Sequence, residues 1–188
     1  FGCVGSRGAG VADYFGIDPK EVDIYMGTLS KSLSSCGGYI AGSENLIEYL
    51  KYTVPGFIFS AGISPANSAA ALAALRMLKA NPQTAKLLQE RSKFFLEACI
   101  ERGIDTGLSK DSAVVPCIVG NSMECMQLSE RLSQRGINVQ PIVYPAVDDD
   151  ASRLRFFLSA THTEDQLLTT ADAIIEELEA IRSGAAAE

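Results

Sequence analysis

GTLSKSLSSCGGYIAG, residues 27–42, is the stretch on which the interpretation of this sequence depends. Lys31 is the only charged residue among the twenty from Ile24 to Ser43. Such a lysine is either a surface residue on a turn or an amine held in a poorly solvated site. Loss of hydration would favour its neutral, nucleophilic form in the second case.

The neighbours of Lys31 favour a ligand with a phosphate group. They supply hydroxyl groups and a pair of glycines: Thr28, Ser30, Ser32, Ser34, Ser35, Gly37 and Gly38. Hydroxyls donate hydrogen bonds to phosphate oxygens, and glycine lets the backbone approach a ligand closely. An amine beside such a cluster is typical of a Schiff base with pyridoxal phosphate.

Outside this stretch, the sequence predicts a mixture of strands and helices. The expected strands are residues 22–28, 37–42, 57–60, 114–120, 137–142 and 153–159, the first two of them buried. The expected helices are residues 44–52, 65–79, 82–102, 122–134 and 163–182. The segment 80–105 is expected to separate an unfinished first layer from a complete small α/β domain.

Composition excludes several classes of protein. A length of 188 residues with 47% hydrophobic residues suffices for one domain or two small ones with a buried core. The net charge of -7 has the wrong sign for binding nucleic acid. No apolar run is long enough for a membrane helix, and no signal peptide is recognised, so a cytoplasmic protein is expected.

The cysteines and the single histidine argue against a metal site. The five cysteines lack the C-x-x-C spacing and are expected to be reduced, mostly packed thiols. With His162 alone, neither a His-ligated metal nor a Ser-His-Asp triad is easily built. His162 is expected to be structural or solvent-facing, and the run Asp148–Asp150 to be a solvated loop. The glycine-rich start also fails both phosphate-loop patterns.

Four segments, taken in chain order, resemble motifs of the α-oxoamine synthases. They are GCVGSRGAGVADYFGI (2–17), GTLSKSLSSCGGYIAG (27–42), PGFIFSAGISP (55–65) and RLRFFLSATHT (153–163). The resemblance implies the α/β, aspartate-aminotransferase-like fold of the type I pyridoxal-phosphate enzymes. It further implies that residues 1–80 end the large cofactor-binding domain and that residues 81–188 form the small carboxyl-terminal domain.

The resemblance also implies roles for five residues. Lys31 matches the lysine that binds pyridoxal 5'-phosphate and moves the proton at the substrate α-carbon. Thr28 and Ser30 match hydroxyls that hold the cofactor phosphate. Ser60 matches a hydroxyl that reaches the cofactor of the neighbouring subunit, which implies a homodimer with a shared active site. Arg155 matches the arginine that pairs with the substrate carboxylate through two parallel hydrogen bonds.

The residues by themselves leave other interpretations open. Thr28 and Ser30 fit ordinary hydroxyls at a strand end and in a turn, and Arg153 and Arg155 fit solvated charges on a half-exposed strand. The chain also departs from the family pattern: it has Ala61 where threonine is common, and Gly8-Ala9-Gly10 where Gly-Arg-Gly is common. The family's cofactor-binding Asp and His are expected a few positions before Phe1. The chain is therefore expected to be a fragment that is not competent alone.

The expected reaction is the condensation of an amino acid with an acyl thioester, either acyl-coenzyme A or an acyl carrier protein, with decarboxylation to an α-aminoketone. Two alternatives remain. One is an aminotransferase of the same fold, and the other is a non-catalytic partner subunit.

Overall fold

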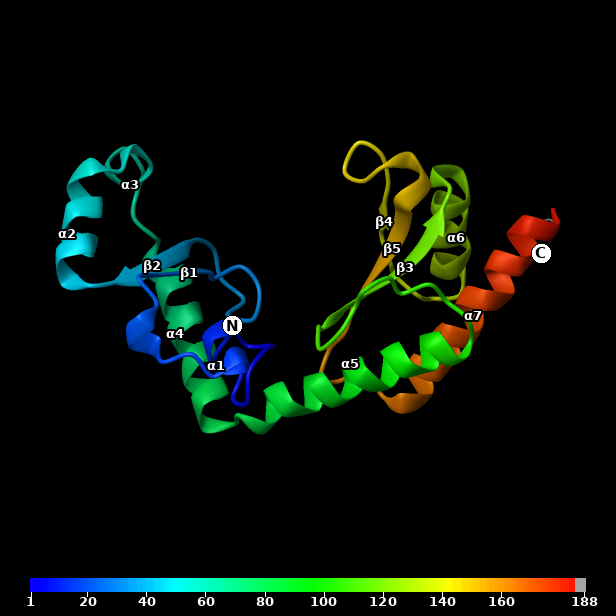
Figure 1. The fold of residues 1–188 in the computed structure, drawn as a ribbon, viewed down its shortest axis with the longest axis horizontal. Coiled ribbons are helices and arrows are strands. Elements are labelled where there is room, and N and C mark those ends of the chain that lie inside the picture. Colours follow the sequence, from blue (N-terminus) through cyan, green and yellow to red (C-terminus); the bar gives the residue numbers. More distant parts are fainter. Residues whose placement is uncertain (185–188) are drawn as a thin grey trace. The chain divides into compact units, whose positions relative to one another are not determined.

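The computed structural model describes residues 1–184 and divides into two units. Unit 1 is Phe1–Lys86, and unit 2 begins at Leu87 (Figure 1). The division falls within one long helix, α5 (Gln83–Glu101). None of the helices in residues 1–184 is long and apolar enough to cross a membrane.

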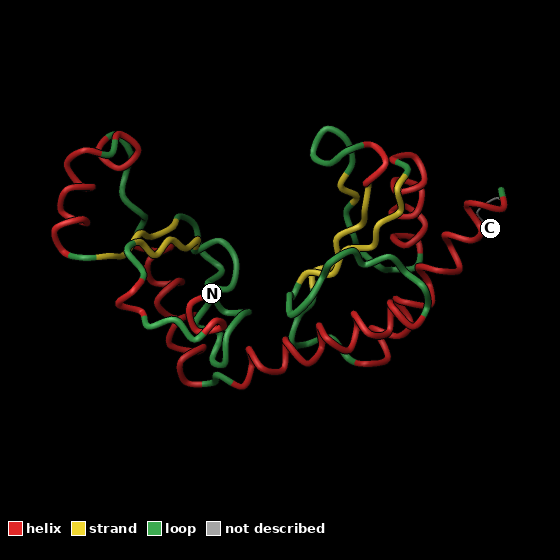
Figure 2. The backbone as a smooth tube through the Cα atoms, viewed as in Figure 1, coloured by secondary structure: helices red, strands yellow, loops and turns green. Residues whose placement is uncertain are grey.

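Unit 1 contains a two-stranded antiparallel sheet with helical elements before and after it in the chain (Figure 2). Its strands are β1 (Ile24–Thr28) and β2 (Gly38–Gly42), which pair with Met26 opposite Ile40. The loop between them carries Lys31. The helical elements are α1 (Val11–Phe15), the short turn Pro19–Glu21, α2 (Glu44–Thr53), α3 (Pro55–Ile58) and α4 (Pro65–Ala80).

Two predictions for unit 1 are wrong. The strands are present but not buried, since Met26 is 78% and Ile40 is 53% exposed. Two strands alone cannot enclose both faces of their sheet. Residues 57–60 form no strand, because Pro55 begins the helical turn α3 and the N–H of Phe57 bonds the carbonyl of Val54.

Unit 1 has few buried apolar side chains of its own. Within residues 1–86 these are Leu33, Ala71 and Ala85. Many large apolar side chains are exposed instead, including Val11, Phe15, Met26, Tyr52, Phe57 and Phe59. A surface of this kind is uncommon on a protein that is complete by itself.

Unit 2 is a three-stranded antiparallel sheet combined with helices. The strands β3 (Val114–Gly120), β4 (Pro141–Ile142) and β5 (Ser152–Phe157) lie in the order β3-β5-β4. The helices are α5, α6 (Ser122–Gln134) and α7 (Glu164–Ser183), and Asp149–Ala151 forms a short helical turn. These three helices and the strands β3 and β5 agree with the predicted ranges to within about two residues. The strand predicted at 137–142 is shorter, because the Val139 carbonyl bonds the Ser129 hydroxyl of α6 at 2.6 Å rather than a strand.

The core of unit 2 follows from the alternation of side chains along its strands. Buried residues alternate on β3 and β5, and register places Cys117 opposite Leu154 and Val115 opposite Phe156. Phe95 of α5 packs on Phe156 with ring centres 5.4 Å apart. The amphipathic faces of α6 and α7 complete the core with Leu128, Leu132, Leu167, Ala171 and Ile174.

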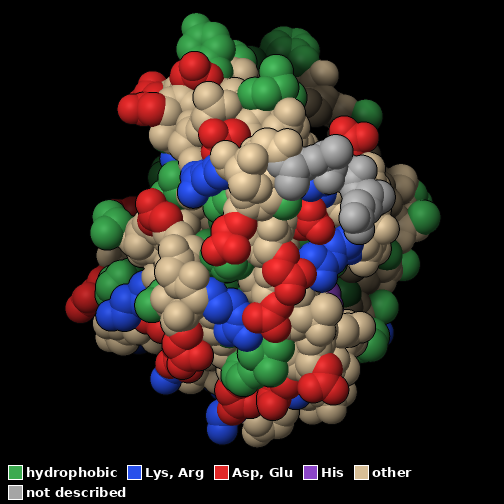
Figure 3. Space-filling model, turned by 90° about the vertical axis from the view of Figure 1, so that its right-hand side faces the viewer, with side chains coloured by type: hydrophobic (Ala, Val, Ile, Leu, Met, Phe, Trp, Pro, Cys, Tyr) green, Lys and Arg blue, Asp and Glu red, His purple; other side chains and the backbone are tan. Residues whose placement is uncertain are grey.

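Charged side chains lie on the outside of unit 2. Arg135 bonds Glu176 and Glu177, and Arg131 bonds Glu177, which joins α6 to α7. In the face shown by Figure 3, acidic and basic side chains alternate over much of the surface. Exposed pairs of this kind contribute little each to stability.

Three of the five cysteines, Cys99, Cys117 and Cys125, are packed in the core, as the sequence predicted for most of them. Burial raises the pKa of both Cys99 and Cys117 to about 12 and that of Cys125 to about 11. Within residues 1–184, no cluster of three or more His, Cys, Asp or Glu side chains could hold a metal ion.

Candidate active site

Lys31 lies exposed near the tip of the loop that joins β1 to β2. Its ammonium group donates a hydrogen bond to the Ser30 hydroxyl at 3.4 Å. Of the two interpretations of the isolated lysine, this geometry is that of a residue on a turn. Although Lys31 is the only charged residue in the segment 24–43, its side chain is therefore not buried within unit 1.

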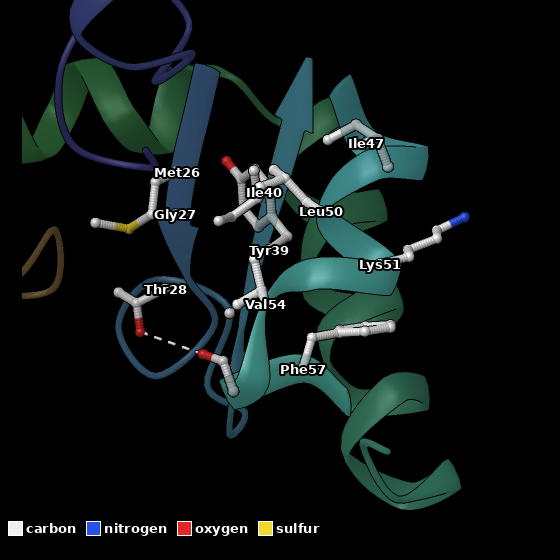
Figure 4. Close-up of a pocket in the computed structure, with 12 residues that line it drawn as sticks. Met26, Gly27, Thr28, Tyr39, Ile40, Ile47, Leu50, Lys51, Val54 and Phe57 are labelled. Atoms are coloured by element: carbon white, nitrogen blue, oxygen red, sulfur yellow. Dashed lines mark hydrogen bonds between the residues drawn. The ribbon is translucent and has the colours of Figure 1, made fainter. Parts of the chain in front are cut away.

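Thr28 and Ser30 lie beside the amine, as predicted for a phosphate site. Their hydroxyl oxygens are 2.8 Å apart, and the backbone N–H of Ser30 donates to the Thr28 hydroxyl at 3.2 Å. The Thr28 hydroxyl also contacts the Gly37 carbonyl at 3.4 Å, the dashed line in Figure 4. Two hydroxyls and an amine thus occupy one short turn.

The loop of residues 29–37 is closed by its own backbone. The N–H of Leu29 donates to the Gly37 carbonyl, the N–H of Ser35 to the Leu29 carbonyl, and the N–H of Ser34 to the Lys31 carbonyl, each at 2.9–3.0 Å. The Ser35 hydroxyl bonds the Asn67 carbonyl of α4 at 2.6 Å. The loop therefore has a defined shape without any ligand.

Gly37 and Gly38, where the loop meets β2, are required by the packing of unit 1 itself. A Cβ on Gly38 would lie 2.9 Å from the Gly27 carbonyl oxygen, and one on Gly37 would lie 3.1 Å from the Ile63 side chain. Gly37 also has a φ of 107°, which side chains disfavour. The structure thus explains both glycines by close packing, whereas the sequence suggested the approach of a ligand.

Ser60 follows α3, and its hydroxyl donates to the Gly56 carbonyl at 2.5 Å. Ser60 is exposed, and no hydrogen bond among the described residues joins it to the Lys31 loop. Its hydroxyl is therefore engaged locally, at the end of the helical turn.

Sequence reasoning missed a cavity of about 540 Å³ in unit 1. It lies between the sheet and helices α2 and α3, and Figure 4 shows Tyr39, Ile40, Leu50, Val54 and Phe57 around it. Thr28 is one of the residues that line it, whereas Lys31 is not. The apolar residues of β2 and α2 were the signal for this cavity in the sequence.

Arg155 belongs to unit 2, whereas the other four predicted site residues belong to unit 1. It is exposed on the face of β5 opposite the core, and its guanidinium lies 4.9 Å from the centre of the Phe157 ring. Arg153 shares this face and donates to the Ala151 carbonyl at 2.8 Å. The strand thus fixes the direction of the Arg155 side chain, and the N–H groups of its guanidinium face solvent.

The polar residues set aside in the sequence have structural partners. The Nδ1 atom of His162 accepts a hydrogen bond from the Ser159 N–H at 3.2 Å, as expected for a structural histidine. In the acidic run, Asp149 accepts a hydrogen bond from the Ser122 hydroxyl at 2.5 Å.

The chain matches the family model described as "Aminotransferase class I and II" over residues 2–174. It is 39% identical over 180 residues to an 8-amino-7-oxononanoate synthase of Thermosipho melanesiensis, covering 96% of this chain and 44% of that protein. It is 38% identical over 166 residues to a serine palmitoyltransferase of Sphingobacterium spiritivorum, covering 88% and 41%. The chain thus spans less than half the length of these curated relatives.

Solved structures agree with these matches. An 8-amino-7-oxononanoate synthase from Francisella tularensis superposes with a TM-score of 0.84 at 25% identity, covering 97% of this chain and 53% of that one. A structure described as SPT with PLP internal aldimine gives a TM-score of 0.88 at 23% identity, covering 97% and 46%, which bears on the fold alone.

The predicted aspartate-aminotransferase-like fold is therefore confirmed. The order of the four sequence motifs and the curated relatives point to the same branch of that fold. The chain belongs to the aminotransferase class I and II family, and the curated relatives that it resembles are α-oxoamine synthases.

Proposed function

We propose that this chain is the carboxyl-terminal part of a pyridoxal-phosphate-dependent α-oxoamine synthase. The reaction joins an amino acid to the acyl group of a thioester and releases a free thiol and carbon dioxide. The observation that carries this proposal is the juxtaposition of Thr28, Ser30 and Lys31 in one turn, in the order of the family motif.

The donor groups of this turn fit the cofactor. The hydroxyls of Thr28 and Ser30 are close enough to donate hydrogen bonds to one phosphate group, and the amine of Lys31 lies beside them to bind the aldehyde covalently. When bound, pyridoxal phosphate supplies an electron sink for negative charge at the substrate α-carbon.

The other site residues have binding and proton-transfer roles in this proposal. The Lys31 amine accepts the proton from the substrate α-carbon, and Arg155 pairs with the substrate carboxylate. Ser60 reaches the cofactor phosphate of a second subunit in a homodimer.

The exposed apolar surface of unit 1 supports a larger parent domain. Residues 1–80 then form the end of the large domain, and residues 81–188 form the small domain. Polypeptide equivalent to the unmatched part of the relatives would cover side chains such as Met26, Phe57 and Phe59. We place the parent protein in the cytoplasm, where the buried thiols stay reduced.

Cofactor binding is tested by reduction with borohydride. The protein that contains residues 1–188 should become yellow with pyridoxal phosphate, and borohydride should fix the cofactor to the peptide that carries Lys31. Lys31→Ala should abolish the label, whereas Lys51→Ala, which removes an exposed lysine of α2, should keep it. Labelling at another lysine in wild type, with covalent binding retained in Lys31→Ala, would contradict the proposal.

The type of reaction is tested by its products. A synthase should release thiol and carbon dioxide in equal amounts from candidate acyl thioesters, and both should depend on the amino acid. An aminotransferase would instead form a keto acid and the pyridoxamine form of the cofactor, with no thiol released. A non-catalytic subunit would do neither, although it has no physical need for an amine beside two hydroxyls.

A further inference from the structure

Ser32, the residue after Lys31, is hydrogen-bonded to Phe1, thirty-one positions earlier in the chain. Its hydroxyl donates a hydrogen bond to the Phe1 carbonyl at 3.0 Å and lies 3.6 Å from the Cys3 sulfur. Together with the Ser35–Asn67 bond, this contact fixes the loop of residues 29–37 to chain outside the loop. Of these two hydrogen bonds, the one made by Ser32 lies directly next to Lys31 in the chain.

Gly2 makes this contact possible. It is buried with a φ of 83°, and a Cβ at this position would overlap the Cβ and Oγ of Ser32. A side chain at position 2 would therefore push Ser32 away. The close approach requires glycine for steric reasons as well as for its backbone angle.

The segment that holds Ser32 is itself ordered by hydrogen bonds. The N–H of Gly2 donates to the Gly8 carbonyl at 2.7 Å, and the N–H of Gly10 to the Val4 carbonyl at 2.9 Å. The Asp13 carboxylate of α1 accepts a hydrogen bond from the Ser6 hydroxyl at 3.1 Å. Residues 1–10 thus form a closed turn that can act as a fixed support.

We propose that Ser32 is a positioning residue for Lys31, acting through its hydrogen bond to this glycine-rich turn. The inference rests on the proposed role of Lys31. A lysine side chain has four rotatable bonds, so the reach of its amine depends on where its Cα is held. Displacement of a reacting group by about 1 Å can slow a reaction on the order of a hundredfold. Ser32 therefore limits the positions of the amine without touching the reacting atoms.

The test compares three variants of the protein that contains residues 1–188. Ser32→Ala removes the hydroxyl, Ser32→Thr keeps it, and Ser34→Ala is the matched control. Ser34 lies in the same loop, and its hydroxyl has no hydrogen-bond partner among residues 1–184. Melting temperatures are measured for all variants, so that a general loss of folding is recognised.

The first measurement is hydrogen exchange at the Ser35 amide without cofactor. Loss of one hydrogen bond should lower its protection about fivefold in Ser32→Ala. Ser32→Thr should restore protection, and Ser34→Ala should leave it unchanged after correction for intrinsic rates. Unchanged protection in Ser32→Ala would overturn the proposal, whatever the cofactor does.

The second measurement is the initial rate of borohydride-trapped labelling by pyridoxal phosphate at Lys31, relative to Lys51 in the same molecules. We expect the ratio to fall several-fold in Ser32→Ala and to recover in Ser32→Thr. Because a general loss of structure would also remove the preference for Lys31, the ratio is compared only between variants that are folded at the assay temperature. An unchanged ratio in Ser32→Ala overturns the positioning role. No trapping at Lys31 in a wild-type protein with normal loop protection overturns the proposed function instead.

Discussion

Arg155 illustrates how a strand determines the surroundings of a single charged residue. Alternate residues of β5 face opposite sides of the sheet, so Leu154 and Phe156 are buried while Arg155 is exposed between them. The contact with Phe157 orients the guanidinium but leaves its hydrogen-bond donors available. This geometry suits recognition of a carboxylate.

We expect Arg155→Lys to weaken amino-acid binding to the cofactor-loaded protein by about 2 kcal/mol or more, because lysine cannot form the paired hydrogen bonds. The visible spectrum of the bound cofactor before substrate addition should not change. Spectroscopic titration with amino acids measures the effect. Arg153→Lys, on the same strand face, serves as the control, and equal binding by both variants and wild type would show that Arg155 is an ordinary surface charge.

The buried thiols predict a strong difference in cysteine reactivity. Raising the pKa of Cys99 from 9.0 to about 12 lowers its thiolate fraction at neutral pH about a thousandfold, and burial also blocks access. Cys36 is exposed. In native protein, alkylation followed by mass spectrometry should modify Cys36 and leave Cys99, Cys117 and Cys125 intact. Modification of the buried three at the rate of Cys36 would contradict the structure.

The same thiols predict a dependence of stability on pH. Their pKa values are higher in the folded state, so the unfolded state loses protons first as pH rises above about 9. The free energy of unfolding should therefore fall between about pH 9 and about pH 12, by up to about 1.4 kcal/mol per pH unit for each thiol. Urea titrations should show a shallower fall for Cys117→Ala, and an identical slope would rule out this contribution.

Helix α7 shows how an element begins where its sequence places a capping pair. The Thr163 hydroxyl accepts the Gln166 N–H at 3.2 Å, and the Gln166 side chain accepts the Thr163 N–H at 3.0 Å. An ion pair of Arg91 with Glu164 joins this helix to α5, and an ion pair of Asp172 with Arg102 joins it to the residue that follows α5. Local capping and the Arg91–Glu164 pair thus act together at the start of α7, whereas the Arg102–Asp172 pair acts near its middle.

Thr163→Ala should destabilise unit 2 by about 1 kcal/mol, because it removes the acceptor for the first turn of α7. Thr169→Ala, inside the same helix, should be neutral or slightly stabilising, since alanine has the higher helix propensity. Thermal and urea unfolding followed by circular dichroism measure both. Equal effects of the two substitutions would mean that the cap contributes nothing measurable.

At the scale of the whole molecule, the buried apolar residues are divided unequally. Unit 2 has a continuous core that includes Phe95, Leu128, Leu154 and Ile174, whereas unit 1 buries little beyond Leu33. Fully burying one large apolar side chain is worth about 1.5–3 kcal/mol, so the difference decides which unit can fold independently.

We expect residues 87–188 to fold cooperatively when produced alone, and residues 1–86 to remain without a sharp unfolding transition. Calorimetry and hydrogen exchange of the two pieces measure this. A cooperative transition for residues 1–86 alone would show that this unit needs no further polypeptide. Absence of one for residues 87–188 would show that the core described for unit 2 is insufficient.

Much of the architecture could be predicted from local sequence alone. Proline and serine at the start of α4, the capping pair of α7 and the alternation in β3 and β5 act within a few residues, so the sequence determined these elements almost to the residue. The grouping of Thr28, Ser30 and Lys31 was equally predictable, because one short turn contains all three.

Other features were decided only by tertiary structure, because they depend on contacts between distant residues. Segment 57–60 has strand-like composition, but a strand needs a partner from elsewhere in the chain, and no strand among the described residues pairs with it. The exposure of Met26 and Lys31 depends on what covers the sheet, which no local pattern specifies. The bond from Ser32 to Phe1 spans thirty-one positions.

By itself, then, the sequence determined the helix starts, the strand pattern and the residues around the amine. The tertiary structure decided which of those residues are buried and which contacts hold the loop of residues 29–37. Burial and long-range hydrogen bonds form only when distant parts of the chain pack together.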